Sequence, residues 1–152
     1  MRIGLFTALA LAAATSLHAQ APVATYAHAT PIAGSWTYRA VADGSEAVFA
    51  NATAQPQLCL RCTRSSRRVS ISKPAAGAAP FLFVWTSSNT RNVPASFKPA
   101  TAQLVAELAM MDPLLDSIAF SRGRFAVSSS GTPALVLPAA PEIDRVVEDC
   151  RT

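Results

Sequence analysis

Period-two alternation of apolar and polar side chains is clearest in the stretch Ser35-Trp36-Thr37-Tyr38-Arg39-Ala40-Val41, residues 35–41. In an extended chain Trp36 and Tyr38 fall on one face, and Thr37 and Arg39 fall on the other. The turn dipeptide Asp43-Gly44 follows, and residues 46–50 resume the extended pattern. This pattern predicts a β-hairpin with one face directed to a core.

The rest of the chain carries strand signals at short intervals. Residues 80–86 are apolar at both parities, which predicts a central strand buried on both faces. Residues 93–97 are at best an edge strand, because Pro94 cannot donate to a ladder. Residues 101–110 fit a strand or a helix by composition, and the strand-rich surroundings favour a strand. Further strands are expected at residues 57–63, 67–73, 124–129 and 134–137.

Two short helices complete the expected domain. Asp112-Pro113 combines an N-cap residue with proline at the first helical position, and the helix that follows ends by Gly123. Pro141 begins a last helix that runs to about Cys150. The fold class is therefore α+β: a mostly antiparallel β-sandwich or partly open barrel in a single domain over residues 34–152, with two short helices, the last one C-terminal.

The first 19 residues have the layout of a secretory signal peptide. Met1-Arg2 is followed by a largely apolar run over residues 3–13, and Leu17-His18-Ala19 suits a signal peptidase. The apolar run is too short for a membrane anchor, so we expect no transmembrane anchor in the mature chain. Residues 20–33 form a flexible lead-in. The chain is therefore expected in the periplasm or outside the cell.

Charge and histidine content disfavour several function classes. Of the 13 basic residues Arg2 leaves with the leader, so 12 basic and 9 acidic residues remain, a net charge of +3. This is too low a charge for a nucleic-acid partner. The mature chain keeps one histidine, His28, in the lead-in, which disfavours histidine-based catalysis and metal binding. No glycine-rich phosphate loop is present, and no cofactor is predicted.

Three cysteines follow the leader. Cys59 and Cys62 form a C-x-x-C string in a strand-like run, where positions three apart point to opposite faces. Strand parity directs Cys62 to the core, and helical spacing from Ile143 directs Cys150 there. We therefore expect a Cys62–Cys150 disulfide, with Cys59 as a free thiol. The alternative is a redox-active Cys59–Cys62 pair.

Basic residues cluster between positions 61 and 73. They could dock an anionic lipid or an acidic protein surface. The alternative, which we favour, is a solvated hairpin whose charges prevent edge-to-edge aggregation. The cluster comprises Arg61, Arg64, Arg67, Arg68 and Lys73.

Two other groups of side chains can be explained either by a role in the fold or by a role in function. The aromatic residues of the strands could line a groove, but core packing is the favoured interpretation; they are Trp36, Phe81, Phe83 and Trp85. Asp112 and Asp116 have helical spacing, yet capping explains the first and nothing marks an acid–base pair.

The layout of the chain also carries a resemblance. A tryptophan strand soon after the leader, a mid-chain strand cysteine, the passage 112–127 and the ending Glu148-Asp149-Cys150-Arg151 resemble small uncharacterised exported proteins of alphaproteobacteria of the sphingomonad type. The layout is more remotely similar to the invasion-associated locus B family, whose cysteine spacing differs. That resemblance implies a periplasmic β-rich protein of a family without a known catalytic activity.

The function expected is a non-enzymatic exported protein that binds a ligand or associates with the cell envelope. The alternatives are an exported protein that acts through the thiol of Cys59, or a hydrolase of unrecognised type.

Overall fold

The computed structural model describes residues 26–152. The expected signal peptide and residues 20–25 of the expected lead-in lie outside the described residues. The described residues form one sheet in the order β1-β2-β3-β4-β7-β6-β5-β8-β9, with every neighbouring pair antiparallel. The elements are β1 (Gly34–Val41), β2 (Gly44–Asn51), β3 (Pro56–Thr63), β4 (Arg68–Pro74), β5 (Phe81–Trp85), β6 (Thr90–Lys98), β7 (Gln103–Ala109), α1 (Pro113–Ala119), β8 (Arg124–Ser129), β9 (Leu135–Pro138) and α2 (Pro141–Arg151).

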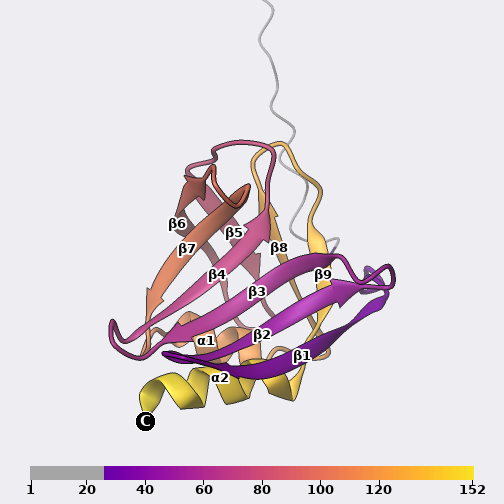
Figure 1. Ribbon diagram of the computed structural model, residues 1–152. Coiled ribbons are helices and arrows are strands. Elements are labelled where there is room, and N and C mark those ends of the chain that lie inside the picture. Colours follow the sequence, from indigo (N-terminus) through magenta and orange to yellow (C-terminus); the bar gives the residue numbers. More distant parts are fainter. Residues whose placement is uncertain (1–25) are drawn as a thin grey trace, which may run out of the picture.

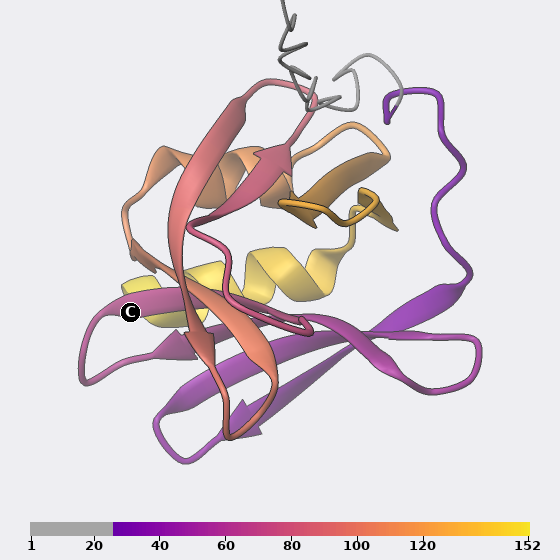
Figure 2. The same cartoon turned by 90° about the horizontal axis from the view of Figure 1, so that it is seen from above.

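The sheet curls into a partly open barrel whose two edges are β1 and β9 (Figure 1). The edges approach each other, because the indole N–H of Trp36 on β1 donates to the carbonyl of Pro138 on β9 over 2.9 Å. Both helices lie at one end of the barrel, and Figure 2 shows α2 between the strands β1–β4 and α1. The predicted α+β fold with a partly open barrel is confirmed.

Residues 26–33, the described part of the lead-in, lie against the sheet. Ile32 donates its backbone N–H to Val136 of β9 over 3.0 Å. The Tyr26 hydroxyl donates to the carbonyl of Thr86, just after β5. The Arg124 guanidinium of β8 donates to the carbonyl of Ala29. This segment therefore contacts the half of the sheet that contains β5, β8 and β9.

The core fills the concave face of the sheet and the space beneath the helices. Alternate residues of a strand point inward, as Val69 and Ile71 do on β4. α2 presents one buried face at helical spacing, and α1 does the same. The buried helical residues are Leu114, Leu115, Ile118, Ile143, Val146, Val147 and Cys150.

β6 lies inside the sheet, so the prediction of an edge strand at residues 93–97 is wrong. Its first half pairs with β5 and its second half pairs with β7. Pro94 lies opposite Phe81 where the partner changes, and the next N–H, that of Ala95, donates to Pro80 over 2.9 Å. A missing N–H costs the ladder little at that position, because one partner strand ends there and the other begins.

Two further strands settle open questions from the sequence. Residues 103–109 form β7, as the strand-rich surroundings favoured. β5 is buried on one face only, which corrects the expectation of burial on both. Its inner residues are Leu82 and Val84, while Phe81, Phe83 and Trp85 face outward.

α1 begins as the capping pattern predicts. A carboxylate oxygen of Asp112 accepts the N–H of Leu114 over 2.9 Å, and Pro113 occupies the first turn. Neither α1 nor α2 combines the length and apolar content needed to cross a membrane; this holds for residues 26–152.

Candidate functional site

Cys62 and Cys150 lie within bonding distance of each other, with their Cα atoms 5.4 Å apart. The alternation of β3 turns Cys62 inward, and Cys150 lies on the buried face of α2. The pair joins the last turn of the C-terminal helix to the end of β3, across 88 residues of chain. Because both sulfur atoms are in the interior, the pair suits a structural role rather than thiol exchange.

Cys59 lies on the outer face of β3 and is the free cysteine of the described residues. Its burial and then the charge of Glu46 raise the pKa of the thiol to about 11, against weaker opposing effects of Ser72 and two arginines. The thiol is therefore protonated at neutral pH. A protonated thiol is a poor nucleophile, and the effects of Ser72 and the two arginines are too weak to activate it.

The five basic residues between positions 61 and 73 do not form one patch. Arg61 lies on the outer face of β3, where its guanidinium pairs with the carboxylate of Glu46 at 3.4 Å. Arg39 on β1 pairs with the same carboxylate. The side chain of Glu46 is only 5% exposed, because the two arginines lie beside it. The charge of Arg61 is therefore balanced locally.

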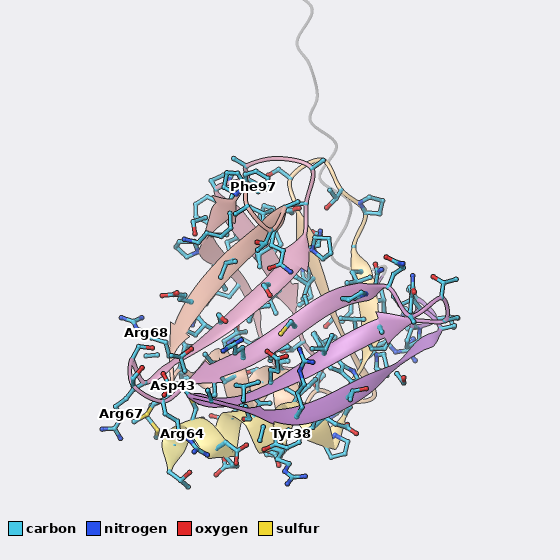
Figure 3. The ribbon with its side chains drawn as sticks, in the orientation of Figure 1. Tyr38, Asp43, Arg64, Arg67, Arg68 and Phe97 are labelled. Atoms are coloured by element: carbon cyan, nitrogen blue, oxygen red, sulfur yellow. A yellow bond between two sulfur atoms is a disulfide. The ribbon has the colours of Figure 1, made fainter. Side chains whose placement is uncertain are left out.

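Three of the five lie together at the turn between β3 and β4, and we call Arg64, Arg67 and Arg68 the arginine tip (Figure 3). All three are exposed, and none lies within 4.0 Å of a carboxylate of the described residues. Arg64 donates to the backbone carbonyl of Asp149, near the C-terminus of α2, over 3.2 Å. A cation at this end of a helix is favourable. Arg64 thus also holds the turn against α2.

The turn between β7 and α1 lies beside the arginine tip. The N–H of Met110 donates to the carbonyl of Arg67 over 3.2 Å, and Arg67 donates back to the Met110 sulfur over 3.3 Å. The next residue, Met111, is 64% exposed. The sequence pattern does not predict that Met111 is exposed, because its exposure depends on the conformation of the turn between β7 and α1. The tip therefore combines three cations with an exposed apolar side chain.

Two carboxylates border the arginine tip. Asp43 accepts hydrogen bonds from the backbone N–H and the hydroxyl of Ser65. Asp149 accepts the hydroxyl of Tyr38 over 2.6 Å. Burial opposes ionisation of Asp149, but the hydrogen bond from Tyr38 and the nearby charges of Arg64 and Arg145 outweigh it and lower its pKa. Asp149 is therefore ionised and offsets part of the charge of Arg64.

Lys73 is separate from the arginine tip, at the opposite end of β4 and on its inward face. The residue is 8% exposed, and its ammonium donates to the carbonyl of Pro74 over 3.3 Å. Lys73 shares strand parity with Val69 and Ile71, so the sequence contained a signal for this position that the run of basic residues concealed. It lines a pocket of about 280 Å³ with Gln57, Pro74, Thr132, Pro133, Ala134 and Leu135.

The four aromatic residues considered for a groove divide between core and surface. Trp36 is buried, with its ring 5.4 Å from that of Phe49. Phe83 and Trp85 stack with ring centroids 6.1 Å apart on the outer face of β5. Phe81, on the same face, is 38% exposed. No single groove contains all four.

Asp112 and Asp116 also have separate roles. Both oxygens of Asp112 accept from the guanidinium of Arg91, at 2.8 and 2.7 Å. Asp116 pairs with Arg151 at 2.9 Å. Within residues 26–152, His, Cys, Asp and Glu side chains form no group of three or more that could hold a metal ion.

Comparison with protein-family models, with curated proteins and with solved structures gives no match.

Proposed function

We propose that this chain is a non-catalytic exported protein of the cell envelope that docks on an anionic lipid surface through the arginine tip. The observation that carries the proposal is the set of three exposed arginines, free of carboxylate pairing in the described residues, beside the exposed Met111. Four of the described arginines outside the tip do pair with carboxylates, and their charges are balanced within the fold. They are Arg39, Arg61, Arg91 and Arg151.

The expected strength of docking follows from charge and apolar area. A basic residue near an anionic membrane surface contributes about 1 kcal/mol. Asp43 and Asp149 border the tip and reduce the contribution of the three arginines, most directly that of Arg64, whose charge Asp149 offsets. Met111 adds an apolar contact at the level of the lipid headgroups. The sum corresponds to reversible binding that weakens as salt screens the charges.

Lipid docking through the arginine tip is better supported than the alternative function, thiol chemistry at Cys59. The raised pKa of Cys59 leaves a neutral thiol, and a reactive cysteine needs the opposite shift. The tip is also a projecting hairpin turn, which can approach a flat surface without a matching cavity (Figures 1 and 3).

The test is flotation of the exported protein with vesicles of phosphatidylethanolamine, with and without phosphatidylglycerol. Wild-type protein is expected to float with the anionic vesicles at low salt, and less at higher salt. Replacement of Arg67 and Arg68 by serine is expected to lower the affinity about 30-fold, since two charges contribute about 2 kcal/mol.

A charge-matched control removes the effect of net charge. Arg67→Glu and Lys98→Glu change the net charge equally. Lys98, however, lies at the end of β6 beside the start of β7, whereas the arginine tip lies near the end of β7. Only Arg67→Glu is expected to abolish flotation. Equal losses for the two variants, or flotation that ignores lipid charge, would contradict docking through the tip. If the protein ignores vesicles but binds a polyglutamate column through Arg67 and Arg68, the partner is an acidic protein.

A further inference from the structure

Lys73 places a cation in a row of inward-facing apolar side chains. It pairs across the strands with Leu104 of β7, and Leu104 pairs with Phe97 of β6. Leu104 is buried, Phe97 packs against the core, and Lys73 itself is 8% exposed. An ammonium group held there loses part of its hydration, a loss that a nearby carboxylate usually compensates.

The described residues provide little compensation for the hydration that the ammonium of Lys73 loses. The ammonium of Lys73 donates one hydrogen bond, to the Pro74 carbonyl, and no carboxylate of residues 26–152 lies within 4.0 Å of it. An ammonium has three N–H donors, so its capacity to bind an acceptor is not filled. Burial accordingly lowers the pKa of Lys73.

The pocket beside Lys73 is lined by residues from the start of β3, the end of β4 and the loop between β8 and β9. Figure 1 shows the end of β4 and the β8–β9 loop on the side of the barrel away from the helices. Its walls are mainly aliphatic, from Pro74, Pro133 and Leu135 among others. The hydroxyl of Thr132 already donates to the Ser129 carbonyl over 2.9 Å. The ammonium is therefore the charged group of an otherwise largely apolar pocket.

We propose that this pocket binds a small monocarboxylate, with the carboxylate on the ammonium of Lys73 and a short aliphatic chain against the walls. One cation balances one negative charge, whereas a phosphate dianion would leave an uncompensated charge in a site of low polarity. The volume of about 280 Å³ is at the lower end for small-molecule pockets, so the ligand is small. This site is independent of the arginine tip.

The probes are hexanoate and 1-hexanol, which share an alkyl chain and differ in charge. Binding to the exported protein is measured by isothermal titration calorimetry and by shifts of the methyl NMR signals of Leu135. Hexanoate is expected to bind at least tenfold more tightly than hexanol, the value of one charge-assisted hydrogen bond. In Lys73→Met the two probes should bind equally, because the ammonium is gone and the apolar walls remain.

Three variants serve as controls. Lys98→Met removes the chain's other lysine, at an exposed position, and should leave the preference for hexanoate intact. The double change of Arg67 and Arg68 to serine should also leave it intact, which separates this site from the arginine tip. Ala134→Phe, at an exposed position of the pocket rim, should block both probes while thermal unfolding stays unchanged.

Several results would overturn the proposal. These are a preference for hexanoate over hexanol that survives Lys73→Met, equal affinity of the wild type for both probes, or no hexanoate binding by the wild type at millimolar concentration. Loss of hexanoate binding in the double arginine variant would assign the anion to the tip instead.

Discussion

At the residue scale, two charged side chains are buried among residues 26–152, and the structure compensates them differently. Glu46 lies between the guanidinium groups of Arg39 and Arg61. The ammonium of Lys73 donates one hydrogen bond, to the carbonyl of Pro74. Glu46 therefore belongs to a closed set of partners on the outer face, whereas Lys73 keeps donors available. This contrast is why a ligand is proposed at Lys73 and not at Glu46.

The lowered pKa of Lys73 predicts a pH dependence of stability. Below its folded pKa the buried ammonium destabilises the fold, and the free energy of unfolding should rise as pH increases from that value toward 10.5. Lys73→Met should thus be more stable than wild type at pH 7, with the difference shrinking at high pH. Urea unfolding at several pH values measures this, with Lys98→Met as the reference. A pH-independent difference, or a less stable Lys73→Met at pH 7, would show that the ammonium is hydrated.

At the element scale, α1 depends on its N-terminus. A helix of seven residues has little stability of its own, so packing and capping must hold it. Asp112 caps the helix through Leu114 and pairs with Arg91 of β6. One carboxylate thus fixes the start of α1 and joins it to a neighbouring strand.

Substitutions at Asp112 should separate its two roles. Asp112→Asn keeps an oxygen for the cap and loses the ion pair, so we expect a cost of about 0.5 to 1 kcal/mol at this partly exposed site. Asp112→Ala loses both and should cost about 2 kcal/mol. Chemical unfolding at pH 7 measures the two values. If Asn costs as much as Ala, the ion pair rather than the cap holds α1.

The same group makes stability depend on acid pH. Burial opposes ionisation of Asp112, but Arg91 and the Leu114 N–H outweigh it and hold the pKa below 3.8. The contribution of Asp112 is therefore complete above pH 3.8 and is lost as pH falls through the lower folded pKa. The two variants should lack this part of the acid transition.

At the scale of the whole molecule, the barrel is open along one seam and is held by contacts distant in sequence. Trp36 joins β1 to β9, and the Cys62–Cys150 pair joins the sheet to α2. A chain cross-link over 88 residues lowers the entropy of the unfolded state by the equivalent of about 4.6 kcal/mol in the chain-entropy model. The cysteine pair and the buried face of α2 both attach the C-terminal helix to the rest of the molecule.

Cysteine substitutions test that cross-link. Cys62→Ser should lower the free energy of unfolding by about 2 to 5 kcal/mol, whereas Cys59→Ser should change it little. Peptide mapping without reduction should recover a Cys62–Cys150 linkage and one titratable thiol at Cys59. A Cys59–Cys62 linkage would instead favour redox chemistry and imply a different register of β3.

The amino-acid sequence by itself determined most of the strands, both helices and the inward positions of Cys62 and Cys150. These follow from local periodicity, since side chains alternate in a strand and recur every third or fourth residue in a helix. The turn and capping residues, such as Asp112, are equally local.

Tertiary structure alone decided which elements lie side by side. β6 is an interior strand because its two halves pair with different neighbours, which no local pattern around Pro94 could reveal. The basic run from Arg61 to Lys73 divides into an ion pair, an exposed tip and a pocket, because strand alternation and the two ends of β4 separate residues that are close in sequence. Met111 joins the tip only because β7 pairs with β4, and such pairing depends on contacts between segments that are distant along the chain.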